Sequence, residues 1–335
     1  MGIQFTDPAQ QPIKIAPYRL SPKKLEFVQE MIDEWLKEEV IIPGNSPWAF
    51  PVVCVPKPNS TDMRLCVDLR RLNQVIVKDS FDAPRNDDAL AWLGGRPYRS
   101  TLDIRWGYHN LSLTKEAQKI LTFACPIGTF SYTRLPFGLA TAGSMFQRYM
   151  NQLLYKHLWK NAVAVVDDVV IGHSDLEQHI TDSFDIINTL AEAGLSAKVT
   201  KLKILPEEFR FLGHISTPHG LKPSPDLVVA IKEMAVPGSI PGADPKTQTR
   251  ALIGIGSYCR KFIKDFAKIS RPLHEAAKPS EPFVWTEECE KAREAIINAL
   301  VESKGVKHPN YKYPLCMRTM RANLDLELMS FKRSQ

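Results

Sequence analysis

Three aspartates lie where short apolar segments end, and their type and spacing suit phosphoryl chemistry. Asp167 and Asp168 interrupt two β-type runs within 162–171 that would pair as a hairpin, and Asp103 lies near the end of another run, 98–104. Carboxylate oxygens are hard ligands for Mg²⁺, and two such ions about 4 Å apart can activate an attacking oxygen and stabilise a leaving one. Taken alone, the Asp pair favours a solvated hairpin turn, because Asp is a common turn residue.

The elements that must position these aspartates read as strands joined by hairpins and mixed with helices. Apolar residues at helical spacing follow Ser21-Pro22, and further helix starts are predicted at Asp244-Pro245 and at Thr286. This mixture predicts an α+β fold, an antiparallel sheet with helices on one face. The expected strands are 50–55, 63–69, 98–104, 119–124, 129–134, 162–166 and 169–171. The expected helices before residue 225 are one that starts at Pro22 and continues through Leu36, and two at about 141–158 and 176–193.

Composition places the chain among ordinary globular proteins. Of its 335 residues, 44% are hydrophobic and 24% are charged, which excludes a disordered chain and suggests about two domains. No apolar run is long enough to span a bilayer and no secretion signal opens the chain, so we expect an intracellular protein without a membrane partner. Six scattered cysteines without a C-x-x-C pair argue against a zinc site.

Charge is unevenly distributed along the chain. The net charge is +6, and the excess of Lys and Arg over Asp and Glu lies after residue 195. A basic half suggests a polyanion partner such as a nucleic acid, although many globular proteins carry a similar asymmetry.

Five sequence blocks follow one another along the chain. They are RLCVDLR at 64–70, LDIRWGYH at 102–109, RLPFGL at 134–139 followed by FQ at 146–147, VVDD at 165–168 and FLGH at 211–214. Supporting stretches lie at 17–22, 45–49, 258–262 and 283–286. In this order the blocks resemble a reverse transcriptase of the gypsy-like LTR retrotransposons, and the resemblance covers about residues 12–315.

This resemblance implies a right-hand polymerase that extends a primer on an RNA or DNA template, an RNA-directed DNA polymerase and hence a nucleotidyltransferase. Its partners would be an RNA template, a DNA primer and product, and deoxynucleoside triphosphates. It would work in the cytoplasm, where virus-like particles are one setting, while a nuclear location and the oligomeric state stay open. The implied parts are an arm and fingers (1–97), a palm with interleaved fingers strands (98–217), a helical start of the thumb and connection (218–300), and a truncated or frameshifted tail without an RNase H domain (301–335).

The resemblance also implies roles for individual residues. Asp103, Asp167 and Asp168 match the catalytic aspartates, which would hold two Mg²⁺ ions together with the carbonyl of Ile104; Mn²⁺ could replace Mg²⁺. The implied nucleotide-binding residues are Lys57 and Arg64 on the triphosphate, Tyr108 against a 2′-hydroxyl, Phe137 beneath the base pair, and Lys201 as proton donor to pyrophosphate, with Lys198 and Lys203 close by. The implied template and primer contacts are Arg70, Gly138, Gln147, Phe211, Leu212, Gly213, His214, Arg260 and Lys261.

The sequence departs from the family pattern at three positions near the aspartates. Val165 replaces the usual aromatic residue before the Asp pair, Arg99 lies four residues before Asp103, and Trp106 stands where a small or polar residue is common. Two alternatives therefore stay open beside an active polymerase. One is a decayed, inactive remnant that still binds nucleic acid, and the other is a Mg²⁺-dependent phosphatase or nuclease with a similar carboxylate cluster.

Overall fold

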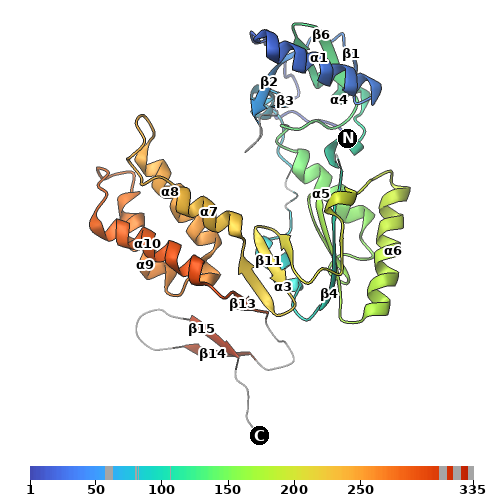
Figure 1. Ribbon diagram of the computed structural model, residues 1–335. Helices are drawn as coiled ribbons and strands as arrows, with labels where there is room; N and C mark the ends of the chain where they lie inside the picture. The colour runs from blue at the N-terminus through green and yellow to red at the C-terminus, as the bar shows by residue number, and fades with distance from the viewer. Residues whose placement is uncertain are drawn as a thin grey trace. The chain divides into compact units, whose positions relative to one another are not determined.

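The computed structural model describes residues 1–56, 63–79, 81, 83–105 and 107–308, together with the backbone of two strands at 315–319 and 326–330. Packing divides the chain into two units, and the chain passes between them several times (Figure 1). The first unit comprises Met1–Pro84, Ser100–Ile171 and Glu177–Leu202, and the second comprises Arg85–Arg99, Gly172–Leu176 and Lys203–Gln335.

A five-stranded sheet forms one part of the first unit. Its order is β1-β6-β5-β2-β3, in which only the β2–β5 pair is parallel. Helix α1 packs on it with Val28, Ile32 and Trp35 buried, and the ring of Trp35 meets Phe123 edge-on at 6.5 Å. The helix begins at Pro22 as predicted, although the Ser21 side chain makes no capping hydrogen bond. The strands are β1 (Ile41–Pro43), β2 (Phe50–Pro56), β3 (Met63–Val67), β5 (Thr122–Cys125) and β6 (Gly128–Tyr132), and α1 is Pro22–Lys37.

A second sheet carries the aspartates. Strands β7 (Ala162–Val165) and β8 (Asp168–His173) form the predicted antiparallel hairpin, and β4 (Tyr98–Asp103) lies next to β8. Every side chain of β7 is buried, which explains why this strand reads as a continuous apolar run. Helix α5 (Ala142–Leu153) packs on β7, and α6 (Leu176–Glu192) follows β8 in the chain.

The second unit joins an antiparallel sheet to a group of helices. The sheet order is β10-β11-β12-β13, and α10 packs against α9 and α7 while α8 packs against α9. Asp244 and Thr286 cap α8 and α10 as predicted, because their side chains accept backbone N–H groups. The elements are α3 (Asn86–Trp92), β10 (Phe209–Phe211), β11 (His214–Thr217), β12 (Gly220–Pro223), α7 (Pro225–Glu233), α8 (Pro245–Tyr258), α9 (Phe266–Ala276), α10 (Glu287–Glu302) and β13 (Val306–Lys307).

Two predicted boundaries are wrong. The expected strand 119–124 starts only at Thr122, because Thr114 caps a helix that runs to Ile120 and buries Ala117. The expected helix 141–158 ends at Leu153. The remaining elements are α2 (Arg70–Asn73), α4 (Lys115–Ile120), β9 (Lys203–Ile204), β14 (Leu315–Thr319), β15 (Leu326–Ser330), and three short 3₁₀ turns, η1 (Gly107–Asn110), η2 (Val199–Lys201) and η3 (Arg260–Phe262). No helix in the described part of the chain is long and apolar enough to cross a membrane.

Candidate active site

Backbone pairing sets Asp103 beside the tip of the aspartate hairpin. The Ile104 N–H donates to the carbonyl oxygen of Asp167 at 2.9 Å, and Val165 pairs with Asp168 across the hairpin. Asp103 precedes Ile104, so its carboxylate lies close enough to raise the pKa of both hairpin aspartates. Three acidic residues from two distant parts of the sequence therefore meet at one place in the first unit.

The side chain of Gln147 supports the tip of the aspartate hairpin. Val166 at the tip has φ = 52°, a left-handed conformation that is costly for a β-branched residue. The fully buried Gln147 side chain accepts the Val166 N–H at 2.7 Å and donates to the Ala164 carbonyl at 2.9 Å. These bonds join α5 to the end of β7 and to the first residue of the turn, so the Gln147 amide fixes the strained tip from which the aspartates follow.

Close packing fixes the position of the Asp167 carboxylate. A Cβ atom on Gly107 would lie 2.5 Å from Oδ1 of Asp167 and 3.1 Å from Cζ of Phe146. A side chain at this position would therefore require the Asp167 carboxylate to shift. Gly107 therefore allows the carboxylate to occupy its place beside Asp103.

Two lysines neutralise Asp103. The Lys198 ammonium lies 2.9 Å from Oδ1 of Asp103, and the Lys201 ammonium lies 2.7 Å from Oδ2. The Lys198 N–H also donates to the Asp103 carbonyl at 2.9 Å, which ties the backbone of this segment to β4. Burial alone would raise the pKa of Asp103, but the hydrogen bonds from Lys201 and Lys198 outweigh it and hold the pKa below its usual value.

The other two aspartates have the opposite electrostatic character. Burial, and then the charge of Asp103, raises the pKa of Asp167 and of Asp168, although Asp168 remains the more exposed of the two. The Oδ1 atom of Asp167 is buried and has no hydrogen-bond partner among the described residues. The negative charge of a carboxylate in this state is poorly compensated, and a neighbouring cation would stabilise it.

The donor set fits a divalent cation, although the arrangement is not a finished metal cage. The oxygens of Asp167, Asp168 and Asp103 are hard donors of the kind that Mg²⁺ prefers. Within the described residues, no group of three or more His, Cys, Asp or Glu side chains is assembled closely enough to hold a metal ion as it stands. Both oxygens of Asp103 are engaged by lysines instead.

An aromatic group adjoins the aspartates. The ring of Tyr108 packs edge-on against Phe137 at 5.0 Å and against Phe146 at 5.6 Å. Tyr108 is half-buried, and burial followed by the charge of Asp167 raises its pKa. Phe137 remains 41% exposed, so this group presents an open apolar surface next to the carboxylates.

The basic residues assigned to the fingers differ in their surroundings. Arg64 is exposed on β3, whereas Lys57 and also Trp106 lie outside the described residues. Arg70 forms a two-point ion pair with Asp68, with Nε–Oδ1 at 2.8 Å and Nη2–Oδ2 at 2.6 Å. The Arg70 guanidinium holds the pKa of Asp68 well below its usual range. Gly138 has φ = 92°, and its carbonyl accepts a hydrogen bond from Asn73 at 2.9 Å.

The remaining predicted contacts all lie in the second unit. Leu212 and Gly213, both with positive φ, form the turn between β10 and β11, and the Tyr258 hydroxyl donates to the Leu212 carbonyl at 2.5 Å. The buried His214 packs against Tyr258 and against Phe262. Phe211 is also buried, Arg260 is exposed, and Lys261 pairs with Asp87 at 2.9 Å. The structure thus brings the FLGH turn together with the segment 258–262.

Sequence reasoning missed two features of the site. The sequence predicts that Gln147 contacts the template, but its side chain is buried and forms hydrogen bonds to the hairpin backbone. Lys198 appeared only as a neighbour of Lys201, yet both contact Asp103. Their three-residue spacing is a signal that could have indicated this, because one helical turn places such side chains on the same side.

The structure combines a mixed α/β fold with an aspartate pair on a hairpin tip and a third aspartate on the adjacent strand. Residues 55–216 match the model of the family described as reverse transcriptase (RNA-dependent DNA polymerase). This stretch of the chain is a reverse transcriptase domain, and the predicted resemblance is confirmed.

Relatives of the chain are retrotransposon polyproteins. It is 30% identical over 324 residues to the retrovirus-related Pol polyprotein from transposon 297 of Drosophila melanogaster, a match that covers 94% of the chain and 30% of the relative. It is 34% identical over 268 residues to the Pol polyprotein from transposon opus of the same organism, covering 79% of the chain and 26% of the relative. The chain thus spans less than a third of the length of these relatives.

Solved structures confirm the predicted α+β fold class. The foamy viral protease–reverse transcriptase in complex with double-stranded DNA matches with a TM-score of 0.81 at 24% identity, over 93% of this chain and 55% of that chain. The foamy viral protease–reverse transcriptase in complex with an RNA/DNA hybrid matches with a TM-score of 0.77, over 93% of this chain and 42% of that chain.

Proposed function

We propose that this chain is the polymerase part of a retrotransposon polyprotein and catalyses RNA-directed DNA synthesis. The observation that carries the proposal is the meeting of Asp103 with the Asp167-Asp168 hairpin, where the buried Oδ1 of Asp167 lacks a partner among the described residues. The intact set of three aspartates favours activity over a decayed remnant. The matched family and the fold argue against the phosphatase or nuclease alternative.

The proposed reaction is in-line nucleotidyl transfer. The primer 3′-oxygen forms a bond to the α-phosphorus of a deoxynucleoside triphosphate, the bond from that phosphorus to the bridging oxygen breaks, and pyrophosphate leaves. Two Mg²⁺ ions, or Mn²⁺ in their place, would be held by Asp103, the Ile104 carbonyl, Asp167 and Asp168, and would supply charge stabilisation for the attacking and leaving oxygens.

The residues of the chain would handle charge and shape around this reaction. The hydrogen bond to Asp103 raises the pKa of Lys201, so its ammonium group stays protonated and can deliver a proton to the leaving pyrophosphate. Arg64 would bind the triphosphate through the paired N–H donors of its guanidinium group, and Lys57 would bind it through its ammonium charge. Tyr108, supported by Phe137 and Phe146, would exclude a 2′-hydroxyl by its bulk.

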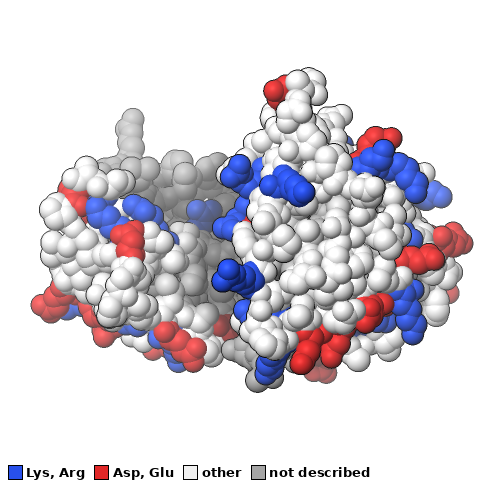
Figure 2. All heavy atoms as spheres, turned by 90° about the horizontal axis from the view of Figure 1, so that it is seen from above, with Lys and Arg blue, Asp and Glu red and all other residues white. Residues whose placement is uncertain are grey.

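Each unit contains residues that we propose as template or primer contacts. Foamy viral relatives of similar fold were solved with double-stranded DNA and with an RNA/DNA hybrid, which supports nucleic-acid partners for this chain. Figure 2 shows a face on which basic and acidic side chains are interspersed, so phosphates would be bound there by individual basic residues. Arg260 and Lys261 of the second unit, Arg70 and Gly138 of the first, and the turn 211–214 are the proposed contacts. The division into fingers, palm and thumb belongs to this proposal, as does an intracellular location.

Primer extension tests the proposal directly. Purified protein should extend a DNA primer on a homopolymer RNA template in Mg²⁺, and an Asp167→Asn variant should bind the same template–primer without extending it. Circular dichroism of the variant checks that it folds. Extension by Asp167→Asn at the wild-type rate would contradict the assigned role of the hairpin.

A further inference from the structure

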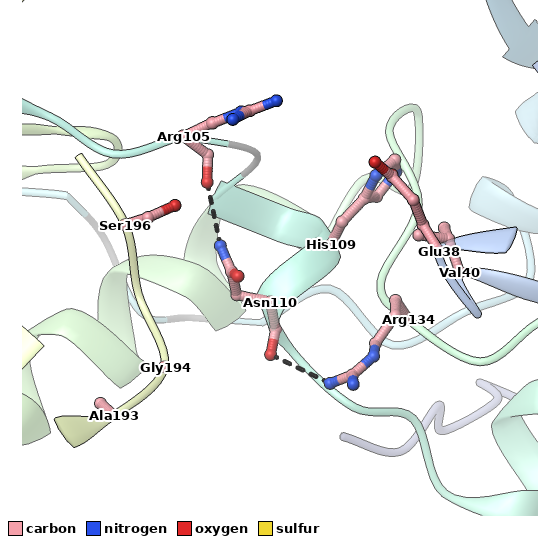
Figure 3. A pocket seen from close by; sticks show the side chains of 9 residues that line it. All are labelled: Glu38, Val40, Arg105, His109, Asn110, Arg134, Ala193, Gly194 and Ser196. Carbon is pink, nitrogen blue, oxygen red and sulfur yellow. Dashed lines mark hydrogen bonds between the residues drawn. The ribbon is translucent and has the colours of Figure 1, made fainter. Parts of the chain in front are cut away.

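A pocket of about 460 Å³ opens in the first unit, next to the chain segment that follows Asp103 (Figure 3). The side chains that matter in it are those of Arg105, Arg134, Glu38, Asn110 and Ser196. None of them has a part in the proposed polymerase reaction. Figure 3 shows Arg105 and Arg134 on opposite sides of Asn110, with Ser196 on one flank and Glu38 on the other. The volume of the pocket is within the range of small-molecule sites.

Hydrogen bonds fix the walls of this pocket. The Arg105 N–H donates to the Ser196 carbonyl at 2.7 Å, and the Asn110 side-chain amide donates to the Arg105 carbonyl at 3.0 Å. On the other side, Arg134 donates to the Ser112 hydroxyl at 2.7 Å, which orients its guanidinium. The pocket therefore has a preformed frame, and a ligand would not have to organise it.

The polar groups that face the pocket remain available. Within the described part of the chain, the Arg105 guanidinium, the Ser196 hydroxyl and the Glu38 carboxylate make no hydrogen bond or ion pair. His109 also lines the pocket, but burial lowers its pKa to about 4, so its ring is neutral near pH 7. The charges offered to a ligand are thus two guanidinium groups and one carboxylate.

This set of groups selects the chemistry of the ligand. Guanidinium groups bind phosphate oxygens through paired N–H donors, and a carboxylate accepts hydrogen bonds from a ribose diol. We infer that the pocket binds a ribonucleoside polyphosphate, with its phosphates between Arg105 and Arg134 and its ribose hydroxyls on Glu38. This is a second nucleotide site, separate from that of the incoming deoxynucleotide.

A mononucleotide fits these groups better than a nucleic-acid strand. A strand presents phosphates at every step, and one of them would meet the Glu38 carboxylate with unfavourable charge. A mononucleotide keeps its phosphates at one end and its hydroxyls at the other. This distribution matches two arginines and one glutamate on different sides of the same pocket.

Calorimetric titration of the whole chain with ATP, in EDTA and without nucleic acid, tests the inference. Without metal and template the polymerase site cannot assemble its substrate, so the heat reports on the pocket. Arg105→Gln should weaken ATP binding about tenfold or more, the loss expected for a charge-assisted phosphate contact. Arg19→Gln, an exposed arginine of the same unit outside the pocket, is the matched control and should bind as the wild type does.

Three further arms distinguish the possible ligands. ATP should bind more tightly than dATP, and Glu38→Gln should reduce that difference. Inorganic triphosphate should compete, because it shares the phosphates, whereas a ten-nucleotide single-stranded RNA should not displace ATP. Asp167→Asn should bind ATP normally, which separates failure of this inference from failure of the polymerase proposal. No ATP binding at millimolar concentration, equal binding by Arg105→Gln and Arg19→Gln, or displacement of ATP by the RNA would overturn the inference.

Discussion

The ammonium group of Lys198 lies 2.9 Å from Oδ1 of Asp103, and the backbone N–H of the same lysine bonds to the Asp103 carbonyl. Lys201 holds the second carboxylate oxygen at 2.7 Å. A divalent cation at Asp103 must therefore share this carboxylate with two internal cations or displace them. We therefore expect the two lysines to compete with a metal ion for the Asp103 carboxylate.

Removing Lys198 should strengthen metal binding at the aspartates. Lys198→Met removes one competitor for Asp103, so Mn²⁺ should bind several-fold more tightly, as measured by electron paramagnetic resonance of the free ion. Lys201→Met should also strengthen binding but should slow primer extension more, because Lys201 is the proposed proton donor. The exposed Lys203 has no bond to Asp103 in the structure, so Lys203→Met is the control. Equal Mn²⁺ affinity in all three variants would contradict competition.

The contact between Gly107 and Asp167 predicts a strong effect of a single methyl group. Gly107→Ala places a Cβ atom 2.5 Å from Oδ1 of Asp167, so the carboxylate must move. We expect primer extension to fall by about a hundredfold, and the free energy of unfolding to drop by about 1–3 kcal/mol, as for other overpacked sites. Gly254→Ala is the control, because its Cβ would meet nothing within 4 Å. Normal extension by Gly107→Ala would show that Asp167 tolerates displacement.

Gln147 should prove important for folding as well as for activity. Gln147→Ala leaves the Val166 N–H and the Ala164 carbonyl without their side-chain partner in a buried place. The free energy of unfolding in urea should fall by about 2–4 kcal/mol, and extension should fall with it. Gln152 is exposed near the end of the same helix, and Gln152→Ala should change stability by less than about 0.5 kcal/mol. A small effect of Gln147→Ala would mean that the tip is held by its own strands.

The Asp167 carboxylate should destabilise the metal-free protein at neutral pH. Its pKa is raised in the folded chain, so the folded state disfavours the charged form, and this penalty is present above the folded pKa. The penalty disappears as pH falls below the unfolded pKa of about 3.9, because both states then hold the proton. In EDTA, Asp167→Asn should therefore melt at a higher temperature than the wild type at pH 7.5, with a smaller difference at pH 4.5. A lower melting temperature for the variant at pH 7.5 would refute this.

Tyr108 should determine the choice between deoxynucleotides and ribonucleotides. Tyr108→Ala removes a ring that Phe137 and Phe146 hold in place, and it opens space for a 2′-hydroxyl. The variant should incorporate ribonucleotides, measured as the ratio of kcat/KM for the two substrates in single-nucleotide extension. Tyr108→Phe keeps the ring and should keep the preference. If Tyr108→Ala still prefers deoxynucleotides as strongly as the wild type does, Tyr108 packs in the core and does not select the sugar.

The sequence by itself determined the family, the α+β fold class and the elements that carry the aspartates. These features depend on local patterns. Apolar runs of five and three residues on either side of Asp167-Asp168 specify a hairpin, and Asp244 and Thr286 specify helix starts through their own side chains. The ordered blocks indicated the family, because their residue types and their order can be recognised in the sequence alone.

Only the tertiary structure decided how these parts act on one another. Lys198 and Lys201 lie far from Asp103 in sequence, as Gly107 does from Asp167, so no local periodicity records their contacts. Gln147 was expected at the template, but packing of α5 on β7 turns its amide toward the hairpin. The pocket between Arg105 and Arg134 also needs the folded chain. Such contacts join residues that chain folding brings together, and their energy depends on distances and burial that the order of residues alone does not contain.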